Sequence, residues 1–123
     1  MASGSPYEER FGFSRAVRVG DRVMVAGTAP VPVPGGEVAA TAYEQMLRCG
    51  EIITAALGEA GASPAGVVRT RVFITDAGDA DEVGRAHREV FGSAAPAATM
   101  VVVAGLLDPA WRVEVEAEAV LGG

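Results

Sequence analysis

The residues best suited to acid–base chemistry are one histidine and a row of carboxylates. Glu114, Glu116 and Glu118 alternate with small apolar residues, so a strand there would present all three carboxylates on one face. A carboxylate acts as a base near neutral pH only when burial or a neighbouring charge raises its pKa. His87 is the only histidine, and an imidazole titrates near neutral pH without such help. The structural alternatives are a solvated strand face for the carboxylates and a core contact for His87.

Metal and thiol chemistry have little support in the sequence. The chain has one cysteine, Cys49, and one histidine distant from it, so we expect no zinc site and no other bound metal. Cys49 falls in a segment of helical periodicity, where a small core residue is the usual role. A lone cysteine excludes an intramolecular disulfide and suits a reducing compartment, so we expect a cytoplasmic protein. No glycine-rich phosphate loop occurs, and we expect no cofactor.

Composition sets limits on size and partners. The chain has 123 residues, 50% of them hydrophobic, with a mean hydropathy of +0.27. This length suits one core, so we expect a single domain over residues 1–123, and the apolar excess favours an oligomer. The formal net charge is −6 without any basic run, so nucleic acid is not an expected partner. No apolar run could span a bilayer and residues 1–6 lack a secretory pattern, so we expect no membrane association.

The hydrophobic pattern predicts the order β-β-α-β-α-β-β. Residues 15–19 and 22–26 flank Gly20-Asp21, which indicates a hairpin. Thr41 and Glu44 form a capping box at the start of a helix that ends near Gly61. The remaining predicted elements are a proline-rich loop over 30–36, a strand over 68–75, a second helix capped by Asp79 and Glu82, and strands over 96–103 and 111–119 joined by a tight connection.

Several short motifs, taken in their order and spacing, resemble the YjgF/Rid family of small trimeric proteins, best known as enamine/imine deaminases. The motifs are Phe13-Ser14-Arg15-Ala16-Val17, Val25-Ala26-Gly27-Thr28, Ala60-Gly61-Ala62-Ser63 followed by Val67-Val68-Arg69-Thr70, Pro96-Ala97-Ala98, and Val113-Glu114-Val115-Glu116-Ala117. The resemblance covers nearly the whole chain. It implies an α+β chorismate-mutase-like fold, a mixed sheet with two helices on one face, and a homotrimer with ligand pockets between subunits. The uncovered face would then carry the charged residues Arg69, Arg71, Arg112, Glu114, Glu116 and Glu118.

One position departs from the family pattern. The family strand opens with Pro-Ala-Arg and its arginine anchors the substrate carboxylate, whereas here Ala98 stands in that place. An arginine–carboxylate contact is worth roughly 1.5–3 kcal/mol, so 2-iminocarboxylates should bind about ten- to a hundredfold more weakly. Arg15, Arg18 and Arg112 could replace the missing cation, but each alternates with apolar residues and is expected to stay solvated. We therefore expect an uncharged or aromatic ligand.

The resemblance also implies a site. It predicts a small-molecule cleft, closed by a neighbouring subunit and bounded by Phe13, Gly27, Ala98, Met100 and Glu114. Glu114 matches the acidic residue that helps to activate water, and His87 falls at a helix position where many relatives have tyrosine, which makes it a further substrate-binding candidate.

Three functions remain open at this point. The first is an atypical Rid-family protein that acts on a small reactive imine, enamine or carbonyl metabolite, with a deaminase- or hydrolase-type activity that differs from standard 2-imino acid deamination because of Ala98. The second is a noncatalytic trimer that binds a small metabolite as a sensor or scavenger. The third is a purely structural or interaction role.

Overall fold

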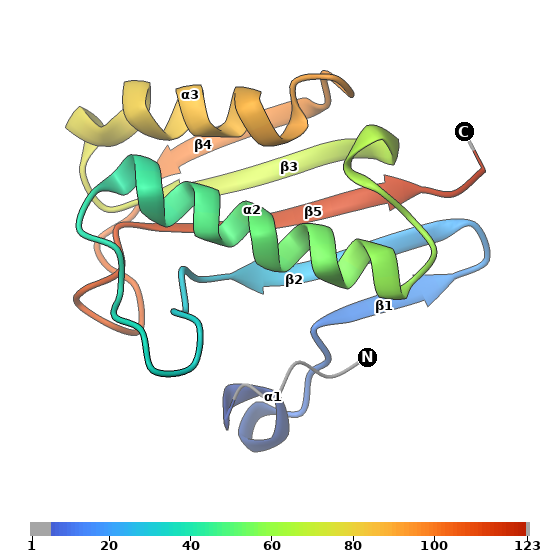
Figure 1. The fold of residues 1–123 in the computed structure, drawn as a ribbon, viewed down its shortest axis with the longest axis horizontal. Coiled ribbons are helices and arrows are strands. Elements are labelled where there is room, and N and C mark those ends of the chain that lie inside the picture. Colours follow the sequence, from blue (N-terminus) through green and yellow to red (C-terminus); the bar gives the residue numbers. More distant parts are fainter. Residues whose placement is uncertain (1–5, 123) are drawn as a thin grey trace.

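A computed structural model describes residues 6–122 of the chain. Five strands form one mixed sheet in the order β1-β2-β5-β3-β4, and two long helices lie side by side across one of its faces (Figure 1). The strands are β1 (Ala16–Val19), β2 (Arg22–Thr28), β3 (Val67–Ile74), β4 (Ala97–Val102) and β5 (Val113–Val120). The helices are α1 (Pro6–Phe11), α2 (Ala42–Glu59) and α3 (Ala80–Phe91), with 3-10 turns η1 (Pro64–Gly66) and η2 (Ala77–Asp79).

The predicted order and α+β class are confirmed, with the addition of α1 before β1. The expected tight connection between the last two strands is wrong. A tight turn would pair β4 with β5, but β3 lies between them, parallel to β4 and antiparallel to β5. Residues 103–112 therefore cross from the edge of the sheet to its centre. The β1–β2 hairpin forms the opposite edge, where β2 pairs antiparallel with β5.

Helix α2 begins as its capping box predicts. The Thr41 hydroxyl oxygen accepts a hydrogen bond from the Glu44 backbone N–H at 3.1 Å, and the hydroxyl donates to the Glu44 carboxylate at 2.9 Å. The helix ends at Glu59, and Gly61 then takes a φ of +88°, a conformation that glycine adopts without strain. Its apolar face packs on the sheet through Met46, Cys49, Ile53, Ala56 and Leu57.

Helix α3 does not begin as predicted, because the side chain of Asp79 makes no capping hydrogen bond. Its carboxylate instead accepts two hydrogen bonds from the Arg112 guanidinium, at 3.0 Å from Nε and 2.8 Å from Nη2. Two hydrogen bonds from one charged guanidinium are stronger than the single bond to an N–H that a cap would make, and they outcompete the cap here. The pair ties the start of α3 to the start of β5.

The two faces of the sheet differ as predicted. On β5 the side chains of Val113, Val115, Ala117 and Ala119 are buried beneath the helices, whereas the glutamates between them face the opposite way. On that uncovered face Arg71 forms ion pairs with Glu116 at 3.1 Å and with Glu118 at 3.4 Å. Within residues 6–122, no helix has the length and apolar character needed to cross a membrane.

Candidate functional site

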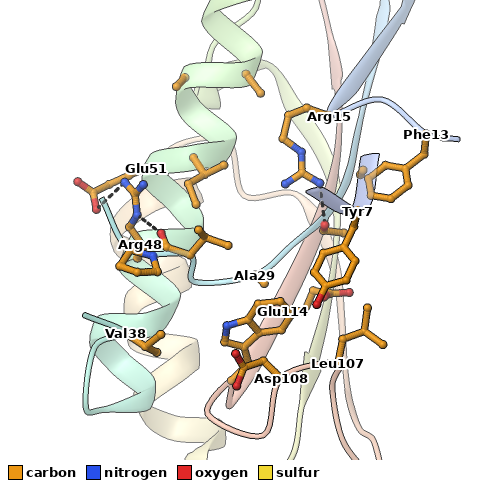
Figure 2. Close-up of a pocket in the computed structure, with 18 of the residues that line it drawn as sticks. Tyr7, Phe13, Arg15, Ala29, Val38, Arg48, Glu51, Leu107, Asp108 and Glu114 are labelled. Carbon is orange, nitrogen blue, oxygen red and sulfur yellow. Dashed lines mark hydrogen bonds and ion pairs between the residues drawn. The ribbon is translucent and has the colours of Figure 1, made fainter. Parts of the chain in front are cut away.

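A cleft of about 990 Å³ lies between α1, the loops that flank β2 and β5, and the outer side of α2. Figure 2 shows Tyr7, Phe13 and Arg15 along one wall, and Arg48 and Glu51 of α2 along the other. Its aromatic lining includes the chain's only tryptophan, one of its two tyrosines and two of its four phenylalanines, namely Trp111, Tyr7, Phe11 and Phe13. Mostly apolar walls with a few convergent polar groups are typical of small-molecule sites.

Glu114 enters this cleft because of where strand β2 ends. The last β2–β5 pair is Thr28 opposite Val115, so Glu114 lies just beyond the paired region. Irregular pairing before Thr28 brings Gly27 against the Glu114 side chain, and a Cβ atom at position 27 would lie 2.8 Å from Glu114 Oε2. Burial raises the pKa of the Glu114 carboxyl, and the nearby Arg15 guanidinium opposes part of this rise. The cleft therefore holds a carboxyl group that is harder to ionise than one in water.

Arg15 also lines the cleft, which corrects the expectation that it stays solvated. Its guanidinium donates a hydrogen bond of 2.8 Å to the backbone carbonyl of Gly27. Its Nε atom is buried and has no hydrogen-bond partner among residues 6–122. Burial lowers the pKa of Arg15, while the carboxylates of Glu8 and Glu114 act in the opposite direction. A cation and a carboxyl group thus share one cleft on either side of Gly27.

The structure brings together some of the predicted site residues and separates others. Phe13, Gly27 and Glu114 line the same cleft. Ala98 and Met100 lie on β4, at the far edge of the sheet, where Met100 packs against the core and Ala98 is exposed. No single subunit can place these two residues in the cleft, so their predicted role depends on a neighbouring subunit and stays a prediction.

His87 lies outside the cleft, on α3. Its Nε2 atom is 2.8 Å from the Thr70 hydroxyl oxygen, and its ring is tilted against Phe91 at 5.2 Å between centroids. Burial lowers the pKa of His87, so the neutral imidazole is favoured. Cys49 is buried on α2, and burial raises the pKa of its thiol, which keeps the sulfur protonated and unreactive. No cluster of three or more potential metal ligands occurs within residues 6–122.

The cleft residues that the sequence did not predict include Tyr7, Arg15 and Trp111. A signal for Tyr7 was present, since Pro6 followed by Glu8 and Glu9 is typical of a helix start. No local pattern could place Arg15, because its partner is a backbone carbonyl twelve positions away in the chain.

Trp111 is held in place by Gln45, a fully buried residue of α2. The Gln45 amide donates hydrogen bonds of 3.0 Å to the carbonyls of Ala39 and Ala110, and its oxygen accepts one of 2.7 Å from the Arg112 N–H. These contacts fix the chain on both sides of Trp111. The aromatic wall is therefore attached to the rigid core.

The comparisons with known proteins agree with this architecture. The family model for Endoribonuclease L-PSP matches residues 6–121. An uncharacterized protein of Streptomyces coelicolor is 44% identical over 99% of this chain and 91% of its own length. The crystal structure of Rv2704 from Mycobacterium tuberculosis, described as a member of the YjgF/YER057c/UK114 family, has a TM-score of 0.89 and 41% identity over 98% of this chain and 96% of that one. Escherichia coli TdcF with bound serine has a TM-score of 0.84 and 27% identity over 98% and 92%. The chain therefore belongs to the Endoribonuclease L-PSP family, that is, to the YjgF/Rid proteins.

Proposed function

We propose that this protein acts on a small reactive imine, enamine or carbonyl metabolite, with a deaminase- or hydrolase-type activity in which Glu114 is the acid–base group. The observation that carries the proposal is the half-buried Glu114 carboxyl group in an aromatic cleft, with its pKa raised by burial. A raised pKa brings a carboxyl group closer to the pH at which it exchanges protons efficiently. Glu116 and Glu118 on the same strand are ion-paired with Arg71, so Glu114 is the strand's carboxylate best placed for chemistry.

The proposed reaction on an imine needs only water and a proton carrier. The carboxylate of Glu114 accepts a proton from water while the water oxygen adds to the imine carbon, and Glu114 then passes this proton to the imine nitrogen. In the resulting carbinolamine the hydroxyl proton moves to the nitrogen through the same carboxylate while the C–N bond breaks, which releases ammonia and leaves a carbonyl product. Gly27 supports this step because its missing side chain leaves space beside Glu114 Oε2.

The substrate and the assembly are parts of the same proposal. With Ala98 at the arginine position, 2-aminoacrylate-type imines should be poor substrates. A homotrimer in which the β4 edge of a neighbouring subunit closes the cleft would complete the site. The bound serine in the TdcF structure supports a small metabolite as the kind of ligand that this fold accepts.

Glu114→Gln tests the catalytic role. An uncharged imine is generated in situ from 2-phenylethylamine by a flavin amine oxidase, and the appearance of the aldehyde is timed with and without the protein. We expect the wild type to accelerate hydrolysis and Glu114→Gln to lower the rate by about 10²–10⁴-fold, the usual contribution of a general acid–base group. The protein should not accelerate hydrolysis of 2-aminoacrylate.

Glu118→Gln is the matched control, since it removes a carboxylate from the same face of β5 outside the cleft. Its rate should equal that of the wild type. Equal rates for Glu114→Gln and wild type would exclude Glu114 as the acid–base group. No acceleration of any imine, together with a metabolite retained through purification, would favour the noncatalytic binding protein instead.

A further inference from the structure

Arg15 places a positive charge inside the cleft, where Ala98 alone would predict none. A guanidinium group carries five N–H donors, and within residues 6–122 the Gly27 carbonyl is its one hydrogen-bond partner. The Nε donor is buried and unpaired. Buried donors are almost always satisfied in folded proteins, so an unpaired one needs an explanation. A ligand with a hydrogen-bond acceptor would provide that explanation, because the guanidinium could move toward the ligand and pair its free donors.

The other cation of the cleft is already engaged. Arg48 donates a hydrogen bond of 2.7 Å to the Val31 carbonyl and lies 3.8 Å from the Glu51 carboxylate. Arg15 is therefore the cation in this cleft with donors to spare, as far as residues 6–122 show.

The aromatic walls add a second requirement on the ligand. Phe13 is 40% exposed and Phe11 is 57% exposed, although both line a concave surface. Tyr7 stacks on Phe11 with ring centroids 5.5 Å apart, which holds these two rings together. Trp111 lies in the same lining. Exposed ring faces gain most from contact with another flat ring.

We infer that the cleft binds a small aromatic acid, whose carboxylate contacts the Arg15 guanidinium and whose ring packs against Phe11 and Phe13. The inference rests on the proposed function in that it names the ligand class of the same cleft. It also replaces the expectation of an uncharged ligand. Arg15, which lies directly before β1, supplies the positive charge that position 98 lacks. A volume of about 990 Å³ is ample for a ring with a short acidic chain.

The carboxylates around Arg15 set how strongly an acid binds. Glu8 and Glu114 both act on the guanidinium electrostatically, so a ligand carboxylate competes with them. Removal of the Glu114 charge should therefore strengthen acid binding. This effect is opposite in sign to the loss of turnover expected for the same variant, so the two proposals can fail independently.

The test is a binding measurement with three probes at fixed pH and ionic strength: 3-phenylpropanoate, its uncharged amide and butanoate. Fluorescence of the chain's only tryptophan, Trp111, reports occupancy, and calorimetry confirms it. We expect wild-type protein to bind 3-phenylpropanoate about tenfold more tightly than either the amide or butanoate, since each lacks one of the two contacts. Glu114→Gln should tighten binding of the acid but not of the amide.

Arg15→Gln should weaken binding of the acid about tenfold and leave the amide unchanged, whereas Arg15→Lys should keep part of the preference. Arg18→Gln is the matched control, because Arg18 lies on β1 outside the cleft and donates to the carbonyls of Gly20 and Ala60. Equal affinity of the wild type for acid and amide overturns the inference without any variant. Butanoate binding as tightly as 3-phenylpropanoate overturns its aromatic part.

Discussion

At the residue scale, the sequence predicted the positions of Glu114 and Gly27 in the candidate site but not that of Arg15. The motif around Glu114 and the glycine at position 27 identified two groups that the structure brings into contact range. Arg15 was predicted to be solvated, because alternation along a strand assigns a face but says nothing of what covers it. The Gly27 carbonyl engages its guanidinium, and α1 brings Glu8 near it. Such long-range contacts depend on the folded chain and leave no mark on the local sequence.

The raised pKa of Glu114 has a measurable consequence for stability. A carboxyl group whose pKa is higher in the folded state than its ordinary 4.5 binds protons more tightly when folded. Stability then falls as pH rises through the window between 4.5 and the folded pKa. Glu114→Gln removes the ionisable group, so the variant does not lose stability in this way as the pH rises. We expect the variant to melt at a higher temperature than the wild type at pH 7, with a difference that shrinks as the pH approaches 4.5.

Thermal unfolding followed by circular dichroism between pH 4 and pH 8, at one protein concentration, measures the effect. Glu118→Gln serves as the control of opposite sign, because it removes ion pairs with Arg71 and Arg22 and gains nothing in return. A Glu114→Gln variant that melts below the wild type at pH 7 would show that the Arg15 contact outweighs the cost of burial.

At the element scale, the two long helices meet through a glycine. A Cβ atom at Gly50 of α2 would lie 2.7 Å from Cγ2 and 3.0 Å from Cγ1 of Val90 on α3. The two helices also meet at Tyr43 of α2. Cζ of Arg85 on α3 lies 4.2 Å from the centroid of the Tyr43 ring, and the Tyr43 hydroxyl donates a hydrogen bond to the Glu89 carboxylate of α3. The close crossing of α2 and α3 therefore depends on the absence of a side chain at position 50.

Two alanine substitutions should separate packing from helix propensity. Gly50→Ala forces the helices apart because valine is stiff at its branched carbon, and we expect a loss of about 1–3 kcal/mol in the free energy of unfolding. Gly84→Ala on α3 meets no atom within 4 Å and should gain roughly 0.5–1 kcal/mol. Urea denaturation of the wild type and both variants measures these changes in the free energy of unfolding. Equal effects of the two substitutions would mean that Val90 accommodates the new methyl group.

Element prediction succeeded where the signal was local. The capping box of α2 and the Gly20-Asp21 hairpin are set by neighbouring residues, and both are present. The crossing of residues 103–112 past β3 was missed because strand order depends on which distant strands pair. The cap at Asp79 failed for the same reason, since its competitor Arg112 is remote in sequence.

At the scale of the whole molecule, the uncovered sheet face favours self-association. Its edges carry exposed valines, Val17 and Val19 on β1 and Val101 on β4, while its centre carries the Arg71 ion pairs. We expect a homotrimer, with light scattering at micromolar concentration giving three times the 12.5 kDa chain mass.

Val101→Glu should shift this mass toward the monomer, because it places a charge on the apolar edge. Gly84→Glu is the control, since it adds the same charge on α3, on the side of the sheet that the helices cover, where a new side chain meets no atom within 4 Å. A monomer mass for the wild type would contradict the trimer and the closure of the cleft by a neighbour.

The position of β5 in the sheet has a consequence for biosynthesis. Strands β2 and β3 do not pair with each other, because β5 lies between them and pairs with both. While the chain is on the ribosome, the backbone groups along the inner edges of β2 and β3 have no strand to pair with until β5, which ends at residue 120, has been synthesised. During that interval they expose unpaired backbone groups, which invite association with other chains. Nascent chains arrested before Val113 should therefore need chaperone protection, and the cleft, which contains Glu114, can form only in the final step of folding.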